Sequence, residues 1–527
     1  MRRRSFMAAG AAGLALPNVA RAQAATTLRF IPQIDLAFLD PHWTTAYVTR
    51  NHSYMVFDTL FGQDGDFKYS HQMLAGHVVE NDGKTWKLTL RDGLLWHDGE
   101  RVLARDCAAS IKRWAKRDAI GDALMKATDE LVATDDKTIQ FRLNKPFALL
   151  PDALGKSPSP MCAMMPERLA NTDPFKQITE IIGSGPYRYI QDERVPGSRN
   201  VYRKFDKYKP REGGKPDWTA GPKIVHFDQV IWTTMPDDGT KASALQAGEQ
   251  DWWENPSTDL TPLLAKNPKI KLAIQDPTGG VEMMRINHLQ APFNNPAIRR
   301  AFMYAIDQAE FMQAIVGDQP DLYYTPLGMF CPKTPMASDV GLEPLKGKRD
   351  YAKVKEMLKQ AGYNGEKTVL MVPNDYVALK AMGDVMADVM KRVGMNVDYV
   401  ATDWGTMLQR RNKKDPVEQG GWSAFITGWA GTDHFSPPAH IALRGNGDQP
   451  SSWPGWCVSP DLERLRTAWF DAPNLAAQQE ICRDMQLAAM RDVPYYPLGQ
   501  FQAPTAYRSD ISGVLNGFAT FWNVRRG

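Results

Sequence analysis

A strand, a helix and a second strand follow one another between residues 368 and 400, and this pattern constrains the fold more than any other feature of the sequence. Strand-forming residues fill 368–372, apolar residues recur at helical spacing over about 376–393, and a second strand pattern covers 396–400. Gly394 can end the helix because glycine adopts a left-handed conformation at little cost. Two strands connected by a helix run parallel, so this part of the chain predicts an α/β domain.

Two further helices of the second half have recognisable ends. Asn295 and Pro296 suit the cap and first position of a helix over 297–307, because asparagine can accept a hydrogen bond from a free N–H and proline has no N–H to leave unpaired. Asp350 begins another helix, and Gly362 ends it. These signals extend the predicted α/β region over most of the second half.

The first third of the chain predicts a different kind of unit. Alternating residues over 78–90 are interrupted by the turn-forming triplet Asn81-Asp82-Gly83, which indicates a β-hairpin. A similar pattern recurs over 132–143, and a helix with an apolar stripe begins near Ala104 between the two hairpins. We therefore expect a small α+β unit with antiparallel strands.

Residues 1–24 are typical of an export signal. Three arginines precede an apolar stretch that is followed by a small-residue cleavage site around Ala22. The pair Arg3-Arg4, followed by Ser-Phe-Met, resembles the twin-arginine type, with an arginine-rich general secretory signal as the alternative. The mature chain is therefore expected in the periplasm. No later stretch approaches the about 18 apolar residues of a spanning helix.

The charge balance argues against nucleic acid as a partner. The 527 residues include 63 Lys and Arg against 60 Asp and Glu, a formal charge of +3. Four of the arginines lie within residues 1–24, so the remainder is close to neutral, whereas nucleic-acid-binding proteins normally carry a basic excess. The length also predicts several lobes rather than one domain.

The five cysteines are too few for a disulfide framework. Cys107 and Cys482 fall inside helical patterns and are expected to be small buried hydrophobes. Cys331 and Cys457 both lie in loops rich in proline or tryptophan, so we expect that any single bridge joins these two.

No motif indicates an enzyme, a cofactor or a resident metal. The glycine segment 182–187 lacks the order of a nucleophile elbow or a dinucleotide loop and predicts a tight loop instead. The sequence contains no HExxH, CxxC or phosphate-binding GxxxxGK[ST] pattern. The pairs His71/His77 and His434/His440 have a spacing that does not share a helix face. An exported hydrolase is a remote alternative, since it would need a nucleophile that the sequence does not reveal.

Tryptophan beside glycine is the clearest signal of a binding surface. Five tryptophans crowd into a glycine-rich part of the second half, where they suit either a ligand-lined cleft or the core of a large domain: Trp404, Trp422, Trp429, Trp453 and Trp456. Trp429 follows an apolar strand inside a Gly-Trp-Ala-Gly loop. This position favours ligand contact for Trp429.

Six segments, in order along nearly the whole chain, resemble one family, the bacterial extracellular solute-binding proteins that include periplasmic dipeptide-, oligopeptide- and nickel-binding proteins. Each segment alone would be weak, but their order makes the match specific. The segments are 86–106, 182–187, 244–251, 287–307, 359–363 and 427–431.

The resemblance implies a two-lobed periplasmic-binding-protein fold of the α/β class, with an extra small α+β domain and a hinge-closing cleft. It places lobe I at 25–56, 178–280 and 497–527, the small domain at 57–177, and lobe II at 281–496. It also implies a receptor that captures a solute between the lobes and delivers it to the membrane permease of an ABC importer. The family favours a monomer that performs no chemistry.

The solute is less closely defined. In dipeptide-binding relatives, an aspartate after the Gly-Trp loop accepts the ligand's amino group, and a basic residue before the long helix takes the carboxylate. Here Thr432 stands at the acidic position, with Asp433 next, and the segment from Met371 to Tyr376 has no arginine. A buried unpaired charge is costly, so a dipeptide would need other anchors.

Candidate ligand-binding residues are therefore drawn from this region. A peptide, a peptide-like solute or an organic cation stacked on tryptophan are all compatible with the two aspartates nearby. A metal chelate that uses His434, His440 or the aromatic wall is the alternative ligand of the same fold. The candidate residues are Trp429, Gly431, Thr432, Asp433, Trp404, Asp375 and Trp422.

Overall fold

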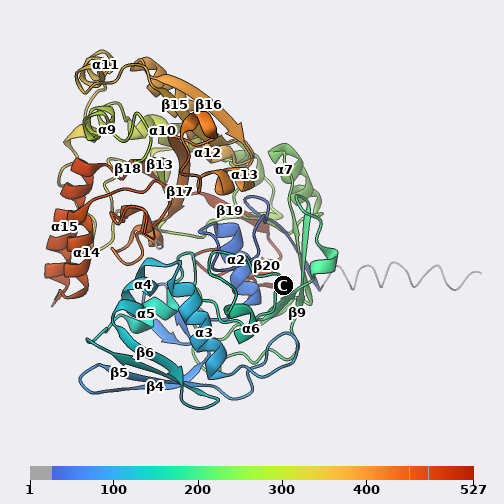
Figure 1. The fold of residues 1–527 in the computed structure, drawn as a ribbon. Coiled ribbons are helices and arrows are strands. Elements are labelled where there is room, and N and C mark those ends of the chain that lie inside the picture. The colour runs from blue at the N-terminus through green and yellow to red at the C-terminus, as the bar shows by residue number, and fades with distance from the viewer. Residues whose placement is uncertain (1–25, 450–451, 473) are drawn as a thin grey trace, which may run out of the picture.

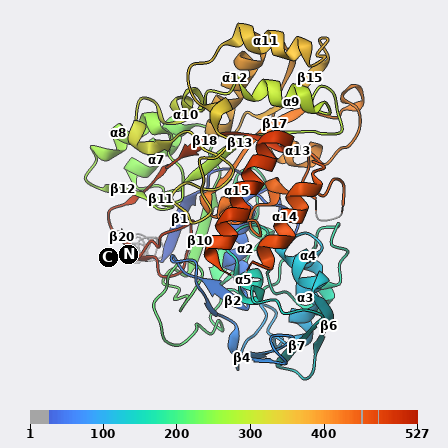
Figure 2. The same ribbon diagram turned by 90° about the vertical axis from the view of Figure 1, so that its left-hand side faces the viewer.

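The computed structural model describes residues 26–449, 452–472 and 474–527, so the predicted export signal at 1–24 lies outside the described residues. Within them, two large sheets and one four-stranded sheet organise the chain (Figure 1, Figure 2). In Figure 1 the helices α9 to α13 lie at the top and the small sheet lies at the bottom.

The first sheet has the strand order β12-β19-β11-β1-β10-β9-β8 in the described part of the chain. The central strand β1 runs parallel to both β10 and β11. Aromatic rings fill its core, with Phe30 lying 5.4 Å from Trp232 and 5.2 Å from Trp252. Its strands and helices are β1 (Thr27–Ile31), α2 (Tyr47–Val56), β8 (Tyr187–Tyr189), β9 (Arg199–Lys204), β10 (Gln229–Thr233), α7 (Asp238–Ala247), β11 (Trp252–Trp253), α8 (Thr261–Ala265), β12 (Ile270–Ile274) and β19 (Pro504–Arg508).

The second sheet has the order β14-β18-β13-β17-β15-β16 in the described residues. Helices α14 and α15 lie side by side at one flank of this unit in both views (Figure 1, Figure 2). Its elements are β13 (Gly280–Ile286), α9 (Pro296–Met303), α10 (Gln308–Val316), β14 (Tyr323–Tyr324), α11 (Tyr351–Gln360), β15 (Lys367–Pro373), α12 (Val377–Arg392), β16 (Asn396–Thr402), α13 (Trp404–Arg410), β17 (Ala424–Ala430), α14 (Pro460–Phe470), α15 (Leu475–Asp492) and β18 (Tyr495–Phe501).

The small unit is built on the antiparallel sheet β4-β5-β7-β6, covered by α3 and α4 around its own core of buried residues. Two short ribbons, β2 with β3 and β20 with β21, complete the described strands. The bounds are β2 (Phe61–Gln63), β3 (Tyr69–His71), β4 (Leu74–Glu80), β5 (Thr85–Leu90), α3 (Ala104–Ala115), α4 (Ala119–Lys126), β6 (Thr128–Ala133), β7 (Thr138–Leu143), α5 (Leu150–Gly155), α6 (Glu167–Ala170), β20 (Ile511–Ser512) and β21 (Arg525–Arg526).

Most local predictions from sequence are confirmed, but the helix predicted over 297–307 ends at Met303, and Asp307 instead caps α10. Strands β15 and β16 pair in parallel on either side of α12, as the pattern over 368–400 required. The Asn295 side chain accepts a hydrogen bond from the Ala297 N–H at 2.9 Å, with Pro296 as the first residue of α9. The hairpin β4–β5 turns through Asn81, Asp82 and Gly83, all with positive φ.

Two short segments connect the first and second sheets. One leads from β12 to β13 through Gln275–Gly280, and the other leads from β18 to β19 after Phe501. Gly279 has a φ of +64°, and a Cβ there would lie 2.3 Å from the Phe501 carbonyl oxygen. Only glycine allows the two segments to approach this closely.

The predicted domain ranges remain a prediction, but the strands can be placed in them. The strands of the first sheet fall in 25–56, 178–280 and 497–527, and the four-stranded sheet falls in 57–177. Strand β18 begins before residue 497, ends at Phe501 and pairs within the second sheet.

The expected bridge between Cys331 and Cys457 is wrong, since both thiols are free and buried, as are the other three cysteines. The Cys331 sulfur accepts a hydrogen bond from Gln500 Nε2 at 3.5 Å. Cys457 lies near Arg285 and Arg299 instead, and burial raises the pKa of its thiol to about 11. Both cysteines lie in loops, but these loops pack against different parts of the second sheet.

Candidate ligand-binding cavity

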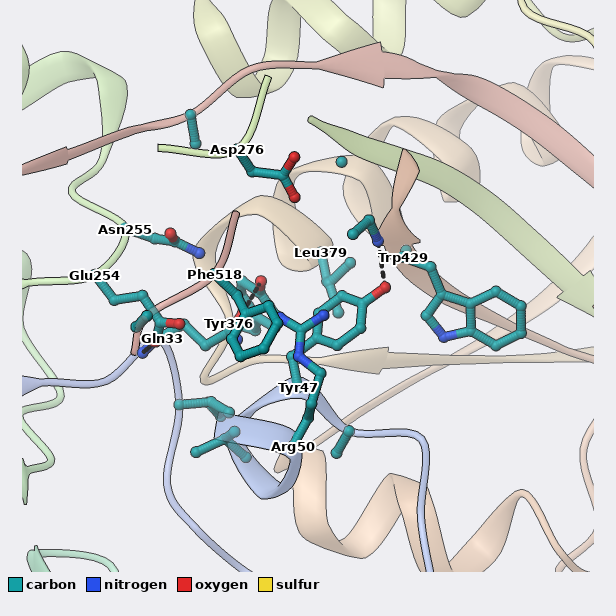
Figure 3. A pocket seen from close by; sticks show the side chains of 18 of the residues that line it. Gln33, Tyr47, Arg50, Glu254, Asn255, Asp276, Tyr376, Leu379, Trp429 and Phe518 are labelled. Carbon is teal, nitrogen blue, oxygen red and sulfur yellow. Dashed lines mark hydrogen bonds between the residues drawn. The ribbon is translucent and has the colours of Figure 1, made fainter. Parts of the chain in front are cut away.

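A cavity that is partly open to solvent lies between the first and second sheets beside the two connecting segments. From the first sheet's side, its polar and aromatic lining includes Gln33, Tyr47, Arg50, Glu254, Asn255 and Phe518 (Figure 3). From the second sheet's side it includes Glu282, Tyr376, Trp404, Arg411, Thr427 and Trp429.

Two tyrosines, Tyr47 and Tyr376, join the two sides of the cavity through hydrogen bonds (Figure 3). The Tyr47 hydroxyl, at the start of α2, donates to Asp433 and accepts from the Ala430 N–H. The Tyr376 hydroxyl, just before α12, donates to Gln33 Oε1 at 2.5 Å. The lining from the two sheets is therefore held together in this structure.

Arg50 provides a positive charge on the first sheet's side. Its guanidinium lies 4.2 Å from the centre of the Tyr47 ring and 4.0 Å from that of Phe518 (Figure 3). Such cation–π contacts stabilise a desolvated cation. The guanidinium also contacts Asn51 Oδ1 at 3.4 Å, so Arg50 is held locally.

Two acids on the same side are satisfied by nearby donors. Glu254 accepts hydrogen bonds from the Gln33 N–H at 2.8 Å and from Asn51 Nδ2 at 2.7 Å. Burial still raises the pKa of Glu254 to about 7. Asp276 accepts from the Thr278 N–H at 2.8 Å, and burial also raises its pKa.

Glu282 is different, because its carboxyl group lies in β13 without a recorded hydrogen bond. The residue is 5% exposed, and its Oε2 has no partner among the described residues. Burial raises the pKa of Glu282 to about 8. Gly428 lies opposite it in the β13–β17 pairing, and a Cβ on Gly428 would lie 1.9 Å from Glu282 Oε2. The missing side chain therefore makes room for the carboxyl group.

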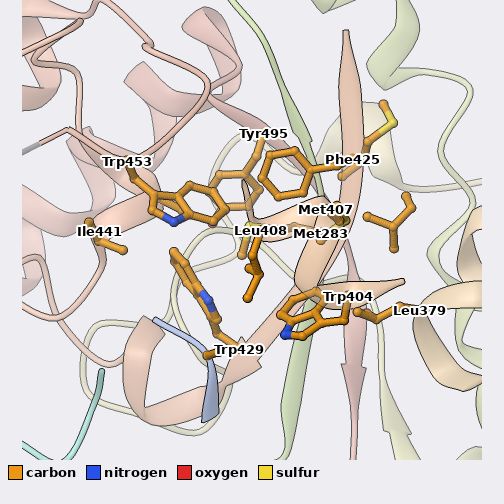
Figure 4. Close-up of a cluster of buried hydrophobic side chains, with 14 of the residues drawn as sticks. Met283, Leu379, Trp404, Met407, Leu408, Phe425, Trp429, Ile441, Trp453 and Tyr495 are labelled. Atoms are coloured by element: carbon orange, nitrogen blue, oxygen red, sulfur yellow. The ribbon is translucent and has the colours of Figure 1, made fainter. Parts of the chain in front are cut away.

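Aromatic and apolar side chains form a buried cluster behind the cavity (Figure 4). The rings of Trp429 and Trp453 lie 4.6 Å apart, and the ring of Trp404 lies 6.2 Å from that of Tyr376. Met407, Leu408 and Phe425 pack around them in the same buried cluster. Of this cluster, Trp404 and Trp429 line the cavity and offer aromatic surface to a solute.

Of the residues proposed from sequence, the structure places Trp404 and Trp429 at the cavity and the others elsewhere. Asp375 is exposed and accepts a hydrogen bond from the Trp404 N–H at 2.9 Å, which orients the start of α13. Trp422 is fully buried, and its indole N–H donates to the Arg411 carbonyl at 3.0 Å.

Gly431, Thr432 and Asp433 form a short 3₁₀ turn that continues β17. Asp433 contacts Tyr47 rather than the cavity, and burial raises its pKa to about 6 against the effect of that hydrogen bond. Thr432 lines a smaller cavity with Phe435 and Trp469. The Asp433 side chain therefore joins the two sides instead of facing the solute space.

Sequence reasoning missed the charged residues of the lining, above all Arg50, Glu282 and Arg411. Glu282 carried a usable signal, since it is an acid inside the apolar strand Val281-Glu282-Met283-Met284. Arg50 and Arg411 carried no such signal in the sequence, because arginines in helical segments are ordinarily exposed.

The two histidines considered for a metal chelate are not at the cavity. His434 Nδ1 lies 3.1 Å from His440 Nε2, and His440 Nε2 lies 2.9 Å from the Tyr495 hydroxyl. Burial lowers the pKa of His434 to about 3. In the described part of the chain, no group of three or more His, Cys, Asp or Glu side chains could hold a metal ion.

Comparison with known proteins agrees with this geometry. Residues 68–450 match the model of the family described as bacterial extracellular solute-binding proteins, family 5, middle. A probable peptide ABC transporter periplasmic-binding protein, y4tO of Sinorhizobium fredii, is 35% identical over 527 residues, covering 99% of this chain and 98% of its own.

Two solved structures share the fold. The periplasmic binding protein AgaA of A. tumefacien R10, in complex with agropinic acid, aligns with a TM-score of 0.79 and 20% identity, over 95% of this chain and 99% of its own. The binding protein DppA of Helicobacter pylori, in complex with the peptide STSA, aligns with a TM-score of 0.78 and 21% identity, over 96% of this chain and 99% of its own.

A cavity lined from two lobes, with hydrogen bonds that join them, is the arrangement of a two-lobed solute-binding protein. The chain belongs to the bacterial extracellular solute-binding proteins of family 5. The predicted family and the two-lobed α/β fold are confirmed, as is the solute-binding function. Lobe I is the unit built on the first sheet, and lobe II is the unit built on the second. Among the described helices, none combines the length and apolar character needed to cross a membrane.

Proposed function

We propose that this chain is a periplasmic receptor that captures a peptide or peptide-like solute and delivers it, chemically unchanged, to the permease of an ABC importer. The observation that carries this proposal is a cavity lined from both lobes and joined by Tyr47 and Tyr376. The peptide class is supported by the name of the relative that is 35% identical along nearly its whole length. The export signal expected at 1–24 supports the periplasmic location.

The physical basis of the mechanism is a shift between open and closed forms. A solute that touches both lobes gains contacts only in the closed form, so its binding shifts the population toward closure. The permease can then distinguish the loaded receptor by its closed shape. A receptor of this kind works as a monomer, because one chain supplies both walls of the cavity.

Native mass spectrometry of the protein purified from periplasm, without denaturant, tests this proposal directly. We expect a bound mass that corresponds to a peptide or peptide-like molecule. Titration of the emptied protein with a dipeptide library should then change the tryptophan fluorescence, because Trp404 and Trp429 line the cavity. A bound molecule unrelated to peptides, or no response to the library, would contradict the peptide class.

Matched tryptophan variants locate the response. Trp429→Phe should reduce the fluorescence change, since Trp429 lines the cavity. Trp86→Phe should retain it, because Trp86 lies on β5 of the small unit and stacks on His77. Equal responses from the two variants would place the solute elsewhere.

A further inference from the structure

Four residues of lobe II reach the cavity with buried polar atoms that have no hydrogen-bond partner among the described residues. They are Glu282 Oε2, Trp404 Nε1, Arg411 Nε and Thr427 Oγ1. A buried polar group without a partner is costly, and a buried charge more so. The facing side of lobe I differs, since Glu254, Asp276 and Arg50 find partners within lobe I. These four polar atoms of lobe II are therefore available to a solute.

Glu282 is the acidic group of this set. Its carboxyl group lies between Gly280 and Gly428, whose added Cβ atoms would fall 2.9 Å from Oε1 and 1.9 Å from Oε2. The titratable group that acts across from it is Tyr376, at the start of α12, which also lies near Glu254. Burial raises the pKa of Glu282 to about 8, and its Oε2 has no partner among the described residues.

Arg411 is the basic group of the set. It follows the last residue of α13, is 6% exposed, and its Nε has no hydrogen-bond partner among the described residues. Its guanidinium lies 5.5 Å from the centre of the Trp453 ring, whose neighbour is Trp429. Burial lowers the pKa of Arg411 to about 9, and the charge of Arg117 adds to this effect.

The two groups do not compensate each other. No hydrogen bond or ion pair joins them in the described part of the chain, where Glu282 Oε2 and Arg411 Nε both lack a partner. They are therefore separate charged positions on one cavity wall. A solute that completes both must carry charges of opposite sign at two places.

We propose that the solute is amphoteric, with a protonated amine that binds Glu282 and a carboxylate that binds Arg411. This inference rests on the proposed receptor function and assigns the residues that bind the two charged groups of the solute. Thr427 and Trp404 add a hydroxyl group and an indole N–H to the same wall. Glu282 and Arg411 thus supply the acidic and basic anchors that are missing at Thr432 and in the segment from Met371 to Tyr376.

An ammonium group bound at Glu282 changes the protonation of the protein as well as the affinity. Glu282 is protonated in the empty cavity at pH 6.5, because its pKa lies near 8. A bound ammonium group favours the ionised carboxylate, so binding releases close to one proton. A carboxyl group that only donated a hydrogen bond would retain its proton.

Calorimetric titration in buffers of different ionisation enthalpy measures this release. The probes are a dipeptide from the responding library, its N-acetyl form and its C-terminal amide. At pH 6.5 we expect proton release for the free dipeptide and the amide, and none for the N-acetyl form. Each blocked form should bind about 10- to 100-fold more weakly, the range expected for losing a hydrogen bond to a charged group.

Variants assign the two positions. Glu282→Gln should abolish proton release and lower the affinity for the free dipeptide. The affinity for the N-acetyl form should not change, which would show that the cavity is intact. Arg411→Gln should lower the affinity for the free dipeptide but not the affinity for the C-terminal amide. Asp152→Asn is the matched control, since Asp152 is another acid whose pKa burial raises, to about 6, yet it lies at the smaller cavity. Asp152→Asn should leave proton release unchanged.

The outcomes separate this inference from the proposed function. Unchanged proton release in Glu282→Gln, or equal affinity for free and blocked forms, would overturn the amphoteric assignment while the receptor function stands. A protein that binds no dipeptide in any form, and carries no peptide from periplasm, would overturn the peptide receptor and the assignment with it.

Discussion

Glu282 and Gly428 show how one pair of residues shapes the cavity. In the antiparallel pairing of β13 with β17, the two residues lie directly opposite each other. The carboxyl group occupies the space that a side chain at 428 would fill. An acid is thus buried where its ionisation is unfavourable, which suits a group that ionises when a solute arrives.

The burial of Glu282 makes the stability of the empty protein depend on pH. An unfolded glutamate has a pKa of about 4.3, whereas burial raises that of Glu282 to about 8. The folded state therefore binds more protons between these values, so the free energy of unfolding falls as pH rises from about 4.5 to about 8. One group contributes a slope of up to about 1.4 kcal/mol per pH unit.

Glu282→Gln should remove this contribution to the slope. The free energy of unfolding of the empty variant, relative to that of wild type, should therefore be larger at pH 8 than at pH 5. Urea unfolding of ligand-free wild type and variant at several pH values measures the difference. Parallel stability curves for the two proteins would show that Glu282 ionises as freely in the folded state as in the unfolded chain.

At the scale of elements, one buried ion pair fixes helix α3 of the small unit to the segment that follows β1. Arg113 on α3 donates to Asp40 Oδ2 at 2.7 Å, and the two side chains are 1% and 0% exposed. Burial opposes the ionisation of Asp40, yet the hydrogen bond and charge of Arg113 hold its pKa below the usual value. Arg113 also donates to the Thr172 and Lys176 carbonyls, so it joins three segments.

Arg113→Met should therefore destabilise the protein by about 3–5 kcal/mol, because Asp40 is left buried without its partner. The double variant Arg113→Met with Asp40→Asn should recover part of this loss, since the uncompensated charge is gone. Chemical unfolding of both variants provides the measurement. Equal stabilities for the single and double variants would mean that packing, rather than charge, is what Arg113 contributes.

The elements were predictable from sequence wherever the signal was local. The strands on either side of α12, the cap at Asn295 and the turn at Gly83 depend on spacing and on residues with distinct backbone preferences. The Cys331–Cys457 pairing failed because loop membership contains no information about which loops meet.

The site was less predictable for the same reason. Trp404 and Trp429 lie next to glycine-rich segments and could be proposed from sequence. Arg50 and Arg411 reach the cavity only through the packing of helices from different lobes, which no local pattern encodes. The family resemblance predicted a cleft between two lobes, but the residues that line it could be identified only from the structure.

At the scale of the whole molecule, closure of the two lobes depends on the segments that connect them and on the hydrogen bonds between them. The lobes are connected by the segment Gln275–Gly280 and the segment after Phe501, which touch at Gly279. Across the cavity, the Tyr47 hydroxyl joins α2 of lobe I to Asp433 and Ala430 of lobe II. The free-energy difference between open and closed forms of such proteins is small enough for one or two hydrogen bonds to shift it.

Tyr47→Phe removes both of these contacts but retains the ring that stacks on Arg50. It also leaves the Asp433 carboxyl group buried without its donor, which disfavours the closed form further. We expect the radius of gyration of the ligand-free variant, measured by small-angle X-ray scattering, to increase. Solute affinity should fall about tenfold, because the fraction of closed protein is lower.

Tyr187→Phe is the control for this variant. The Tyr187 hydroxyl donates to the Phe521 carbonyl at 3.2 Å, and both residues belong to the core of lobe I. Its loss should lower the free energy of unfolding by about 1 kcal/mol without changing the radius of gyration, since no contact between the lobes is removed. If both variants scatter like the wild type and bind solute equally tightly, the Tyr47 hydroxyl does not hold the lobes closed, and closure must depend on contacts with the solute itself.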